Sequence, residues 1–395
     1  MTATLDRPVT TEPTDTTVTD DVDRHPVRPS LQVVPSTRRS DVEATTSLTP
    51  EQIEELGRRL DAIRDRVLGE RGESDAAYIR KVISSQRALE IGGRALLFAG
   101  VLPPAWIAGT AMLSIAKILE NMEIGHNVMH GQWDWMRDPK IHSSTWEWDN
   151  VSSSAEWKNS HNYMHHTYTN VVGKDRDVGY GILRLSEEQK WNPYYLGNPV
   201  YNFLLSLFFQ WGVALHDLEV KKIVAGEKPL SRVWQQVKSI GRKAAKQFTK
   251  DYLVFPALAG PFFLPVLAGN VTANLVRNVW THAVIFCGHF PTGAVQFSEE
   301  QLEGETRGQW YVRQMLGSAN LDGGPVFHLM TGQLSYQIEH HLFPDLPSNR
   351  YAEVAPEVRE LCREYGLEYT SGSLGKQYLQ VLRTINRLAL PSGKR

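Results

Sequence analysis

Eight of the thirteen histidines in this 395-residue chain fall in four short clusters, and any fold of the chain must account for them. The clusters are His126 with His130, His161 with His165 and His166, His289 alone, and His340 with His341. Side chains four residues apart share one face of a helix, with Cβ atoms about 5–6 Å apart. Neutral imidazole is the commonest metal ligand in proteins. Converging faces would therefore form a nitrogen-rich metal site, and Gln337 lies on the same helical face as His340 and His341.

Two long apolar runs lie between and before these clusters. Tyr252–Val276 has no charged residue and is divided by Gly269 and Asn270, and Ala95–Ala116 is interrupted by a Pro-Pro pair at 103–104. A helix needs about 20 apolar residues to cross a hydrocarbon core of about 30 Å. The runs therefore predict two transmembrane helical hairpins that turn at these dipeptides, with the histidines at the membrane border. The four spans are expected near residues 85–102, 105–122, 251–268 and 271–290.

A third apolar run, Pro199–Leu215, is expected to form a helix along the membrane surface instead of crossing it. The clusters can share one site only if an even number of crossings separates them. The basic stretch Lys221–Lys250 follows directly, and a crossing at 199–215 would place it on the wrong side under the positive-inside rule. Arg277 falls within the fourth span and should face protein or water rather than lipid.

The rest of the sequence predicts an all-α membrane protein in which a cytoplasmic helical domain caps the spans and holds a two-metal site. Residues 1–48 are polar with few aromatic side chains, which is typical of a disordered tail, and residues 49–395 are expected to form one domain. No signal peptide is recognisable. Thr49 and Pro50 indicate a helix start, and apolar residues at helical spacing follow from Ile53 to Val67.

The net charge of −2 hides an uneven distribution, because Asp217–Lys250 holds nine lysine or arginine residues against three carboxylates. Nucleic-acid binding, a solvated helix and a membrane-proximal cytoplasmic segment would all fit this stretch. No nucleic-acid recognition motif accompanies it, so the membrane-proximal interpretation is favoured and no nucleic acid is expected as a partner. The two cysteines, Cys287 and Cys362, form no disulfide framework, which favours a reducing compartment.

The ligand set narrows the kind of metal site. A structural zinc ion needs four ligands, so eight clustered histidines indicate two metal ions in one site. His-Glu-x-x-His is absent, which argues against a metalloprotease. Carboxylates are scarce inside the clusters, unlike the Glu-x-x-His pairs of ferritin-like di-iron proteins. Imidazole suits iron, zinc and copper alike, so the ligands alone do not choose the metal.

The order of the motifs is more specific. His-x3-His, His-x3-His-His and Gln-x2-His-His, separated by apolar hairpins, resemble the three histidine boxes of the membrane fatty-acid desaturase family. The resemblance extends to Glu120–His126, His130–Trp135, Phe286–Phe290 and Phe343–Pro347. In these segments the chain is similar to the actinobacterial acyl-CoA Δ9 desaturases, of the stearoyl-CoA or linoleoyl-CoA desaturase-like type. The likeness covers the chain from Thr49 to Pro391.

This resemblance implies a di-iron centre that removes two hydrogens from a long-chain fatty acyl-CoA of the stearoyl or palmitoyl type, using O2 and two electrons. Its iron ligands would be His126, His130, His161, His165, His166, His340 and His341. His289 stands where the family has a lone histidine after the last span. His282 lies seven residues earlier on the same helix, on nearly the same face, and is the alternative candidate for this ligand. Acyl-CoA relatives of the animal type begin the third box with histidine. Gln337 here would bind iron through its oxygen, hold a water, or do neither.

The two electrons need an outside source. The chain has no His-Pro-Gly-Gly haem segment, no nucleotide-binding glycine motif and no cysteine set for an iron–sulfur cluster. A separate NAD(P)H-dependent reductase, of a ferredoxin type or similar, is therefore expected. The loop Asp175–Asp177 would either hold the second-box histidines or be a solvated loop. The sequence assigns no substrate-binding residue.

The expected location is the cell membrane, multi-pass, with the active site facing the cytoplasm and the lipid bilayer around the spans. Two other functions remain open. One is a fatty-acid or alkane hydroxylase with the same iron site, and the other is a non-catalytic metal-binding membrane protein.

Overall fold

The computed structural model describes residues 46–391, which are mostly helical. The longer helices are α2 (Pro50–Gly69), α3 (Glu73–Phe98), α4 (Pro103–Leu119), α10 (Leu230–Phe248), α12 (Phe263–His289), α16 (Tyr351–Glu364) and α17 (Leu374–Ala389). The shorter ones are α5 (Asn127–Met129), α6 (Ser154–Trp157), α7 (Asn198–Leu207), α8 (Phe209–Asp217), α9 (Val220–Val224), α11 (Phe255–Leu258), α13 (Arg307–Leu316), α14 (Pro325–Met330) and α15 (Gln337–Leu342). The predicted polar tail lies outside the described residues except for its last three.

Tighter and wider helical turns connect these elements. The 3-10 turns are η2 (Asp134–Met136), η4 (Gly179–Gly181), η5 (Pro193–Gly197), η7 (Gly260–Phe262), η8 (Glu300–Leu302), η9 (Leu334–Tyr336) and η10 (Ser348–Arg350). The π-helical segments are η1 (Glu120–His126), η3 (Lys158–His165) and η6 (Thr249–Val254). Wider π turns occur mostly as local bulges and often at functional sites. Two of the three here carry predicted ligand histidines.

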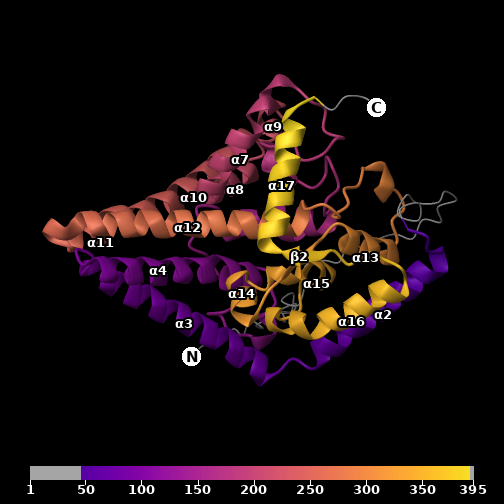
Figure 1. Cartoon of the computed structure of the whole chain (residues 1–395), viewed down its shortest axis with the longest axis horizontal. Helices are drawn as coiled ribbons and strands as arrows, with labels where there is room; N and C mark the ends of the chain where they lie inside the picture. Colours follow the sequence, from indigo (N-terminus) through magenta and orange to yellow (C-terminus); the bar gives the residue numbers. More distant parts are fainter. Residues whose placement is uncertain (1–45, 392–395) are drawn as a thin grey trace, which may run out of the picture. The chain divides into compact units, whose positions relative to one another are not determined.

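Two helical hairpins form one end of this helical unit. Figure 1 shows α3, α4 and α12 running together toward α11, while α2, α13 and α16 gather at the opposite end. The hairpin α3–α4 is held at close range by two glycines: a Cβ atom on Gly93 would lie 2.9 Å from the carbonyl oxygen of Gly109. Small residues allow helix backbones to approach in this way. The Trp106 indole donates to the Pro265 carbonyl (3.0 Å), which joins the tips of the two hairpins.

Both hairpins turn at places that differ from the predicted ones. The Pro-Pro pair at 103–104 opens α4 instead of forming the turn, because proline lacks the N–H that the first helical turn leaves unpaired anyway. The second hairpin turns at η7, where Gly260 has a φ of +57°. Gly269 and Asn270 lie inside the continuous helix α12. A Cβ atom on Gly269 would meet the Leu97 side chain at 2.5 Å, so this glycine serves packing. The predicted boundary between spans 251–268 and 271–290 is therefore wrong.

The predicted surface helix 199–215 is two helices. α7 and α8 meet at Phe208, and the segments Pro193–Leu207 and Phe209–Val224 are bent by 101° there. Across the described residues, no helix taken singly has the length and apolar character needed to cross a bilayer, and this bent pair passes that test only when joined.

Buried charges join the hairpins. Arg277 is 1% exposed and donates to the carbonyl oxygen of Asp149 (3.1 Å), so it faces protein, as predicted. Asp251 is fully buried in η6 and accepts from Arg94 of α3 (3.0 Å) and from Lys117 of α4 (2.8 Å). Charges removed from water are stable only when paired and hydrogen-bonded. This cluster therefore fixes the hairpins relative to one another.

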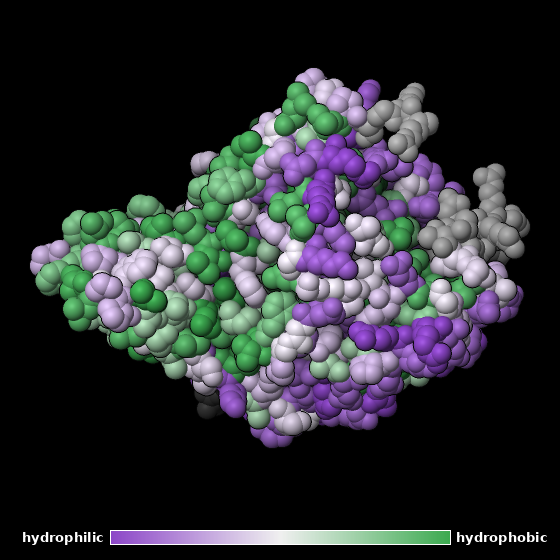
Figure 2. Space-filling model, in the orientation of Figure 1, coloured by the Kyte–Doolittle hydropathy of each residue, from purple (hydrophilic) through white to green (hydrophobic). Residues whose placement is uncertain are grey.

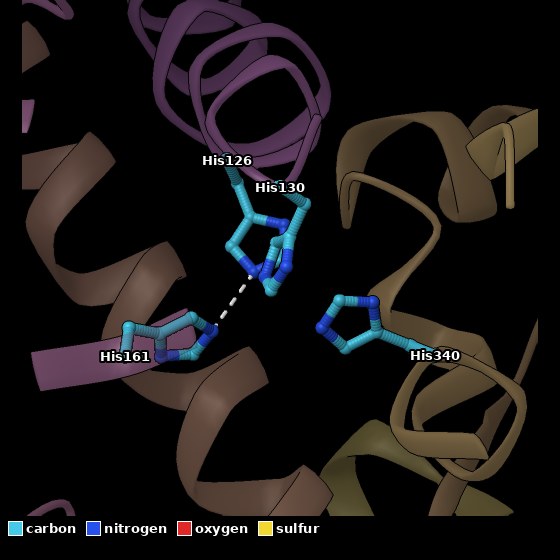
Figure 3. A group of neighbouring side chains, drawn as sticks. All are labelled: His126, His130, His161 and His340. Atoms are coloured by element: carbon cyan, nitrogen blue, oxygen red, sulfur yellow. Dashed lines mark hydrogen bonds between the residues drawn. The ribbon is translucent and has the colours of Figure 1, made fainter. Parts of the chain in front are cut away.

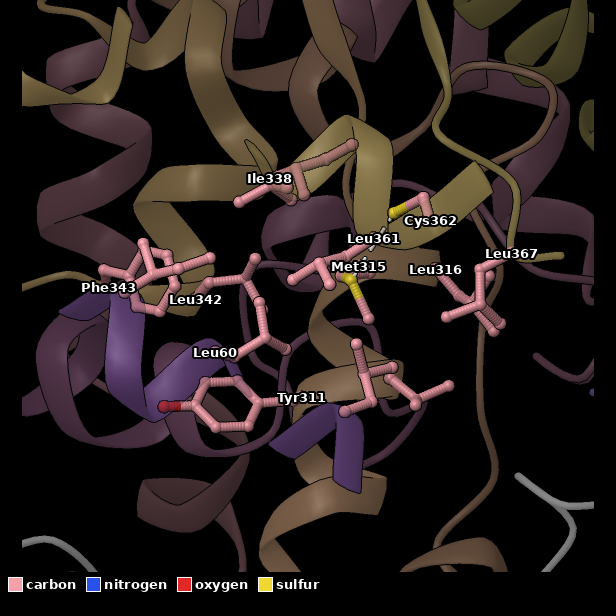
Figure 4. Packing of buried hydrophobic residues seen from close by; sticks show 14 of the residues in the cluster. Leu60, Tyr311, Met315, Leu316, Ile338, Leu342, Phe343, Leu361, Cys362 and Leu367 are labelled. Carbon is pink, nitrogen blue, oxygen red and sulfur yellow. Dashed lines mark hydrogen bonds between the residues drawn. The ribbon is translucent and has the colours of Figure 1, made fainter. Parts of the chain in front are cut away.

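The main apolar core lies at the other end, under the third histidine box. α2 begins as predicted, because Thr49 caps it: the Thr49 N–H donates to Gln52 Oε1 (2.8 Å), and the Thr49 hydroxyl accepts from the Gln52 N–H. The apolar face of α2 packs against α13, α15 and α16 (Figure 4). Ile338 and Leu342 of α15 are buried in this core. Their burial holds the helix that carries His340 and His341 in one position.

The structure departs from an all-α fold at one small parallel sheet. β1 (Asn320–Asp322) pairs with β2 (Ser371–Ser373), with Asn320 opposite Ser371. Strands of only three residues leave almost no sequence signal. The sheet still matters for the site, because the Asn320 side chain accepts from the Ile338 N–H (2.8 Å) and donates to buried Glu339 (2.8 Å). The strand β1 thus fixes the position of the first turn of α15 through the Asn320 side chain.

Candidate metal centre

Three histidines of the first two boxes lie on π-helical segments, whereas His130 directly follows α5 and His166 directly follows η3. His126 ends η1, and His161 and His165 lie in η3. The ring centroids of His126 and His130 are 4.6 Å apart, and those of His161 and His165 are 5.0 Å apart. Each pair therefore shares one face, as the spacing predicts. Gly125 permits the close packing of η1, because a Cβ atom there would lie 2.7 Å from the Glu120 carbonyl oxygen.

Four histidines from three separate segments form the first histidine group. Its members are His126, His130, His161 and His340, and one ring nitrogen of each lies within 4.8 Å of the others. Figure 3 shows the four rings pointing toward a common centre, with His126 and His130 from one helix and with His161 and His340 on opposite sides of that centre. The Nε2 atoms of His126 and His161 are 3.3 Å apart. This arrangement has the donor number and size of a site for one metal ion.

A second histidine group lies directly beside the first. It comprises His165, His289 and His341, whose ring nitrogens also lie within 4.8 Å of one another. His166 lies between the groups: its ring centroid is 4.7 Å from that of His130 and 4.4 Å from that of His341. The structure thus brings all eight clustered histidines together as two adjacent donor sets.

For His165, His340 and His341, a hydrogen bond holds one ring nitrogen and leaves the other free for a cation. Nδ1 is held for His126 by Asn127 (3.0 Å), for His165 by Asp175 (3.0 Å), for His340 by Tyr351 (3.3 Å) and for His341 by Gln314 (3.1 Å). Nε2 of His130, His165, His340 and His341 and both nitrogens of His166 are buried without a hydrogen-bond partner among the described residues. Buried polar atoms rarely stay unpaired. Metal-bound histidines usually anchor their other ring nitrogen in this way, so the donor set fits metal ions.

Burial keeps most of these imidazoles neutral, which is the form that binds metal. Desolvation lowers the pKa of His126 to about 3, and it lowers the pKa of His161 as well. The pKa values of His130, His166, His340 and His341 lie well below the usual value, first through burial and then through neighbouring histidines. His165 differs: burial opposes its protonation, but Asp175 and Asp177 outweigh burial and raise its pKa.

Acid should therefore destabilise the metal-free protein. The unfolded chain binds protons at histidine from about pH 6.5 downward, whereas the buried rings do not until near their lower folded-state pKa, about 3 for His126. Between these values each such ring favours unfolding by about 1.4 kcal/mol per pH unit. His165, with its raised pKa, opposes this trend. The melting temperature of chelator-treated protein should fall steadily from pH 7 to pH 5.

His166→Gln should make this acid-induced fall shallower, because it removes one buried ring. His142→Gln is the matched control, since the His142 ring is partly exposed and hydrogen-bonds the nearby Ser144. A melting temperature that does not change between pH 7 and pH 5 would contradict the buried, neutral state of the rings.

The loop after the second box is not a solvated loop. Asp175 and Asp177 are buried, at 4% and 8% exposure. Asp175 accepts from His165 and from the Asn170 N–H (2.7 Å), and Asp177 contacts His161 at 3.4 Å and His216 at 3.3 Å. The structure therefore agrees with the interpretation in which this loop orients the histidine rings of the second box.

Removing the Asp175 charge should weaken metal binding without unfolding the protein. Asp175→Asn keeps the size of the side chain but lowers the basicity of the His165 ring. We expect metal affinity to fall about 10- to 100-fold, as for other residues that orient metal-bound histidines. Chelator competition on the purified protein measures this. Glu300→Gln, an exposed carboxylate change, is the control, and equal affinities in the two variants would exclude the orienting role.

Gln337 lies at the second histidine group. Its amide nitrogen is 2.9 Å from Nε2 of His289, and its buried Oε1 has no hydrogen-bond partner among the described residues. Nitrogen and oxygen of an amide are assigned from such contacts. The side chain is thus close enough to serve as a further ligand or to hold a water, and both remain proposals.

His282 is not brought to either group. It stacks on Phe286 at a centroid distance of 4.0 Å, and its Nε2 contacts Asn202 Oδ1 at 3.1 Å. It lies seven residues before His289 on α12, about 10 Å along the helix axis. Three further contacts to the boxes, Tyr351, Gln314 and Thr169, were not predicted. The partners in these contacts are 11, 27 and 172 residues apart in the chain, so the sequence offers no signal for the contacts.

Comparison with known proteins agrees with this geometry. The model of the fatty acid desaturase family matches residues 102–373. The chain is 52% identical over 356 residues to the NADPH-dependent stearoyl-CoA 9-desaturase of Mycobacterium tuberculosis, covering 89% of this chain and 83% of the relative. It is 28% identical over 287 residues to an sn-1 linoleoyl-lipid 6-desaturase of Synechocystis, covering 69% and 77%. It is 23% identical over 331 residues to bovine fatty acid desaturase 3, covering 80% and 69%. No solved structure matches the chain.

Proposed function

Because the chain belongs to the fatty acid desaturase family, we propose that it is a membrane-bound acyl-CoA 9-desaturase with a di-iron site. Membership of the family makes it an oxidoreductase. The observation that carries the finer proposal is the pair of adjacent histidine groups in a chain 52% identical to a stearoyl-CoA 9-desaturase. The substrate would be a long-chain acyl-CoA such as stearoyl-CoA or palmitoyl-CoA.

Two iron ions would be held by the two groups. The first would use His126, His130, His161 and His340, and the second His165, His289 and His341, with His166 between them and Gln337 beside the second. Imidazole donors suit several metals, and the family favours iron. When bound, the two irons supply the activation of O2 that removes two hydrogens from adjacent methylene groups.

The protein's own part is to orient the ligands and exclude water. Most of the eight rings are buried, and Trp157 covers His161 at a centroid distance of 4.4 Å. An apolar cluster that includes Met129, Trp157 and Phe286 adjoins the site. When apolar residues enclose a site and exclude water, electrostatic interactions within the site become stronger and side reactions with water are prevented. This supports a reaction on an alkyl chain rather than on a polar substrate.

The electrons would come from NAD(P)H through a separate reductase, of ferredoxin type or similar. The mycobacterial relative is described as NADPH-dependent. The chain itself has no nucleotide-binding glycine motif and no cysteine set for a cluster. The two cysteines of the chain are buried and unpaired, which agrees with an electron source outside the chain.

The hairpin ends would lie in the cell membrane, with the metal site facing the cytoplasm. Apolar residues cover the end formed by α4, α11 and α12 (Figure 2). Leu258, Phe262 and Leu264 at the tip are 51–68% exposed. Exposed apolar patches of this kind mark membrane or protein contacts. The basic residues of α10 favour the cytoplasmic side for the other end.

Deuterated substrate tests the reaction. Stearoyl-CoA carrying deuterium at C9 and C10 is incubated with the protein, NADPH, a reductase and O2, and the acyl products are analysed by mass spectrometry. We expect an alkene that has lost one deuterium from each carbon. A product that has gained oxygen would indicate a hydroxylase. No turnover, with one zinc ion per chain, would indicate a non-catalytic metal protein. His340→Ala provides the inactive control.

A further inference from the structure

One helix joins the membrane hairpin to the rest of the molecule and carries most of the basic stretch. Helical structure continues without a break from Leu230 in α10, through η6, to Leu258 in α11. α11 lies at the apolar tip (Figure 1). The helix therefore leads from the region proposed to lie in the membrane up to the proposed cytoplasmic side. Its surface divides into three faces with different chemistry.

The first face docks α10 onto the protein through polar contacts. Arg232 pairs with Glu156 (2.9 Å), Lys243 pairs with Glu147 and donates to the Trp148 carbonyl (3.0 Å), and Gln247 accepts from Gln210 (3.0 Å). These positions, with Gln236, recur on one side of a helix. The basic residues on this face are therefore already neutralised by carboxylates of the chain.

The second face is an apolar ridge that points away from the protein. Its members are Leu230, Trp234, Val237 and Phe248, which are 40–78% exposed. An uncovered apolar ridge bordered by charged residues is the pattern by which helices contact the boundary between lipid and water. The exposed tryptophan is typical of the interface, where its ring has both apolar and polar neighbours.

The third face is a row of three cations one helical turn apart, Lys238, Arg242 and Lys246. All three side chains are exposed, and no carboxylate of the described residues forms an ion pair with them. The Lys238 ammonium lies 5.5 Å from the centre of the Trp234 ring, so the row borders the ridge directly. The cations of α10 are thus of two kinds: some hold the helix against the protein through ion pairs, and others remain available to bind an anion outside the protein.

We propose that this cation row binds the headgroups of anionic phospholipids while the apolar ridge contacts the acyl chains. Long basic side chains bury their stems in apolar surroundings and extend their charge to the headgroup level. Each lysine or arginine near an anionic leaflet strengthens binding about fivefold at moderate salt. A purely electrostatic contact with an acidic protein would use the cations but leave the ridge beside them exposed. The inference rests on the proposed membrane location.

Lipid retention tests it without any need for turnover. The whole chain is reconstituted in bilayers of equal phosphatidylcholine and phosphatidylglycerol and extracted in mild detergent, and the retained lipids are counted by mass spectrometry. The triple variant K238Q/R242Q/K246Q should lower the ratio of retained phosphatidylglycerol to phosphatidylcholine at least about threefold. K238R/R242K/K246R, which keeps the charges, should retain the original ratio.

The control is K140Q/K376Q/R383Q, which removes three exposed cations elsewhere and should leave the ratio unchanged. An equal ratio in the row variant and the parent, with normal total lipid, would overturn the inference. A chain that retains no phospholipid at all would instead overturn the membrane location. If the row variant keeps the ratio but slows reductase-driven turnover in pure phosphatidylcholine, the row docks an electron carrier and the lipid proposal is wrong.

Discussion

Replacing His340 with alanine should abolish desaturation and empty the first histidine group while the second keeps its metal. His340 is fully buried, comes from a different part of the chain than its three partners, and presents an unpartnered Nε2 to them. Without it three donors remain in that group. We expect turnover to fall at least about 1000-fold, a loss of about 4 kcal/mol of transition-state stabilisation. Iron per chain should fall from about two to about one.

The complementary variant is His165→Ala, which removes a member of the second group. It should cause a similar loss of turnover but deplete the other iron, so Mössbauer spectra of the two variants should lack different components. His340→Gln keeps most of the side-chain volume and guards against a simple packing defect. Membrane insertion should be unchanged in all three proteins. Full activity in either alanine variant would contradict that ligand assignment.

Two histidines outside the groups serve as controls. His328→Gln alters a half-buried ring that contacts Ser335 and Tyr336 and should retain both irons. His282→Gln tests the rival ligand on α12, whose ring contacts Asn202 and Phe286 instead. Loss of one iron in His282→Gln would show that the ring moves to the centre when metal is present.

The proximity of the paired histidines was predictable because their geometry is local. A spacing of four residues brings His126 to His130 and His161 to His165 on regular or π-helical turns alike. The start of α2 was predictable for the same reason, since its cap involves only Thr49 and Gln52. The hydrogen-bond partners of Nδ1 in His340 and His341 were not predictable. Tyr351 and Gln314 reach these rings only through tertiary packing.

The hairpin turns show why glycine and proline were misread. A glycine in an apolar run fits either a turn or a close helix contact. Gly269 permits close contact with Leu97 inside a helix, whereas Gly260 adopts a positive φ in a turn. The Pro-Pro pair at 103–104 equally fits a turn or a first helical turn, and the structure uses the second. Only packing between distant segments decides these cases, and the sequence contains that information only indirectly.

The buried charges should dominate the stability of the hairpins. Asp251→Asn keeps the shape of the side chain but leaves Arg94 and Lys117 without their shared carboxylate. Breaking a buried pair in this way costs about 3–5 kcal/mol. Each cation keeps one other carboxylate, Glu90 for Arg94 and Asp149 for Lys117, so we expect a loss near the lower end, about 3 kcal/mol. The melting temperature in detergent should fall by several degrees.

A second variant separates charge from packing. Lys117→Met combined with Asp251→Asn removes one charge of each sign, and replacing a buried pair by uncharged residues is often nearly neutral. The double variant should therefore recover much of the lost melting temperature. Glu360→Gln, which breaks the exposed pair with Arg363, should change nothing measurable. An unchanged melting temperature in Asp251→Asn would mean that water reaches the cluster. Since α4 leads into His126 and α12 ends at His289, a loosened cluster should also weaken metal retention in both histidine groups.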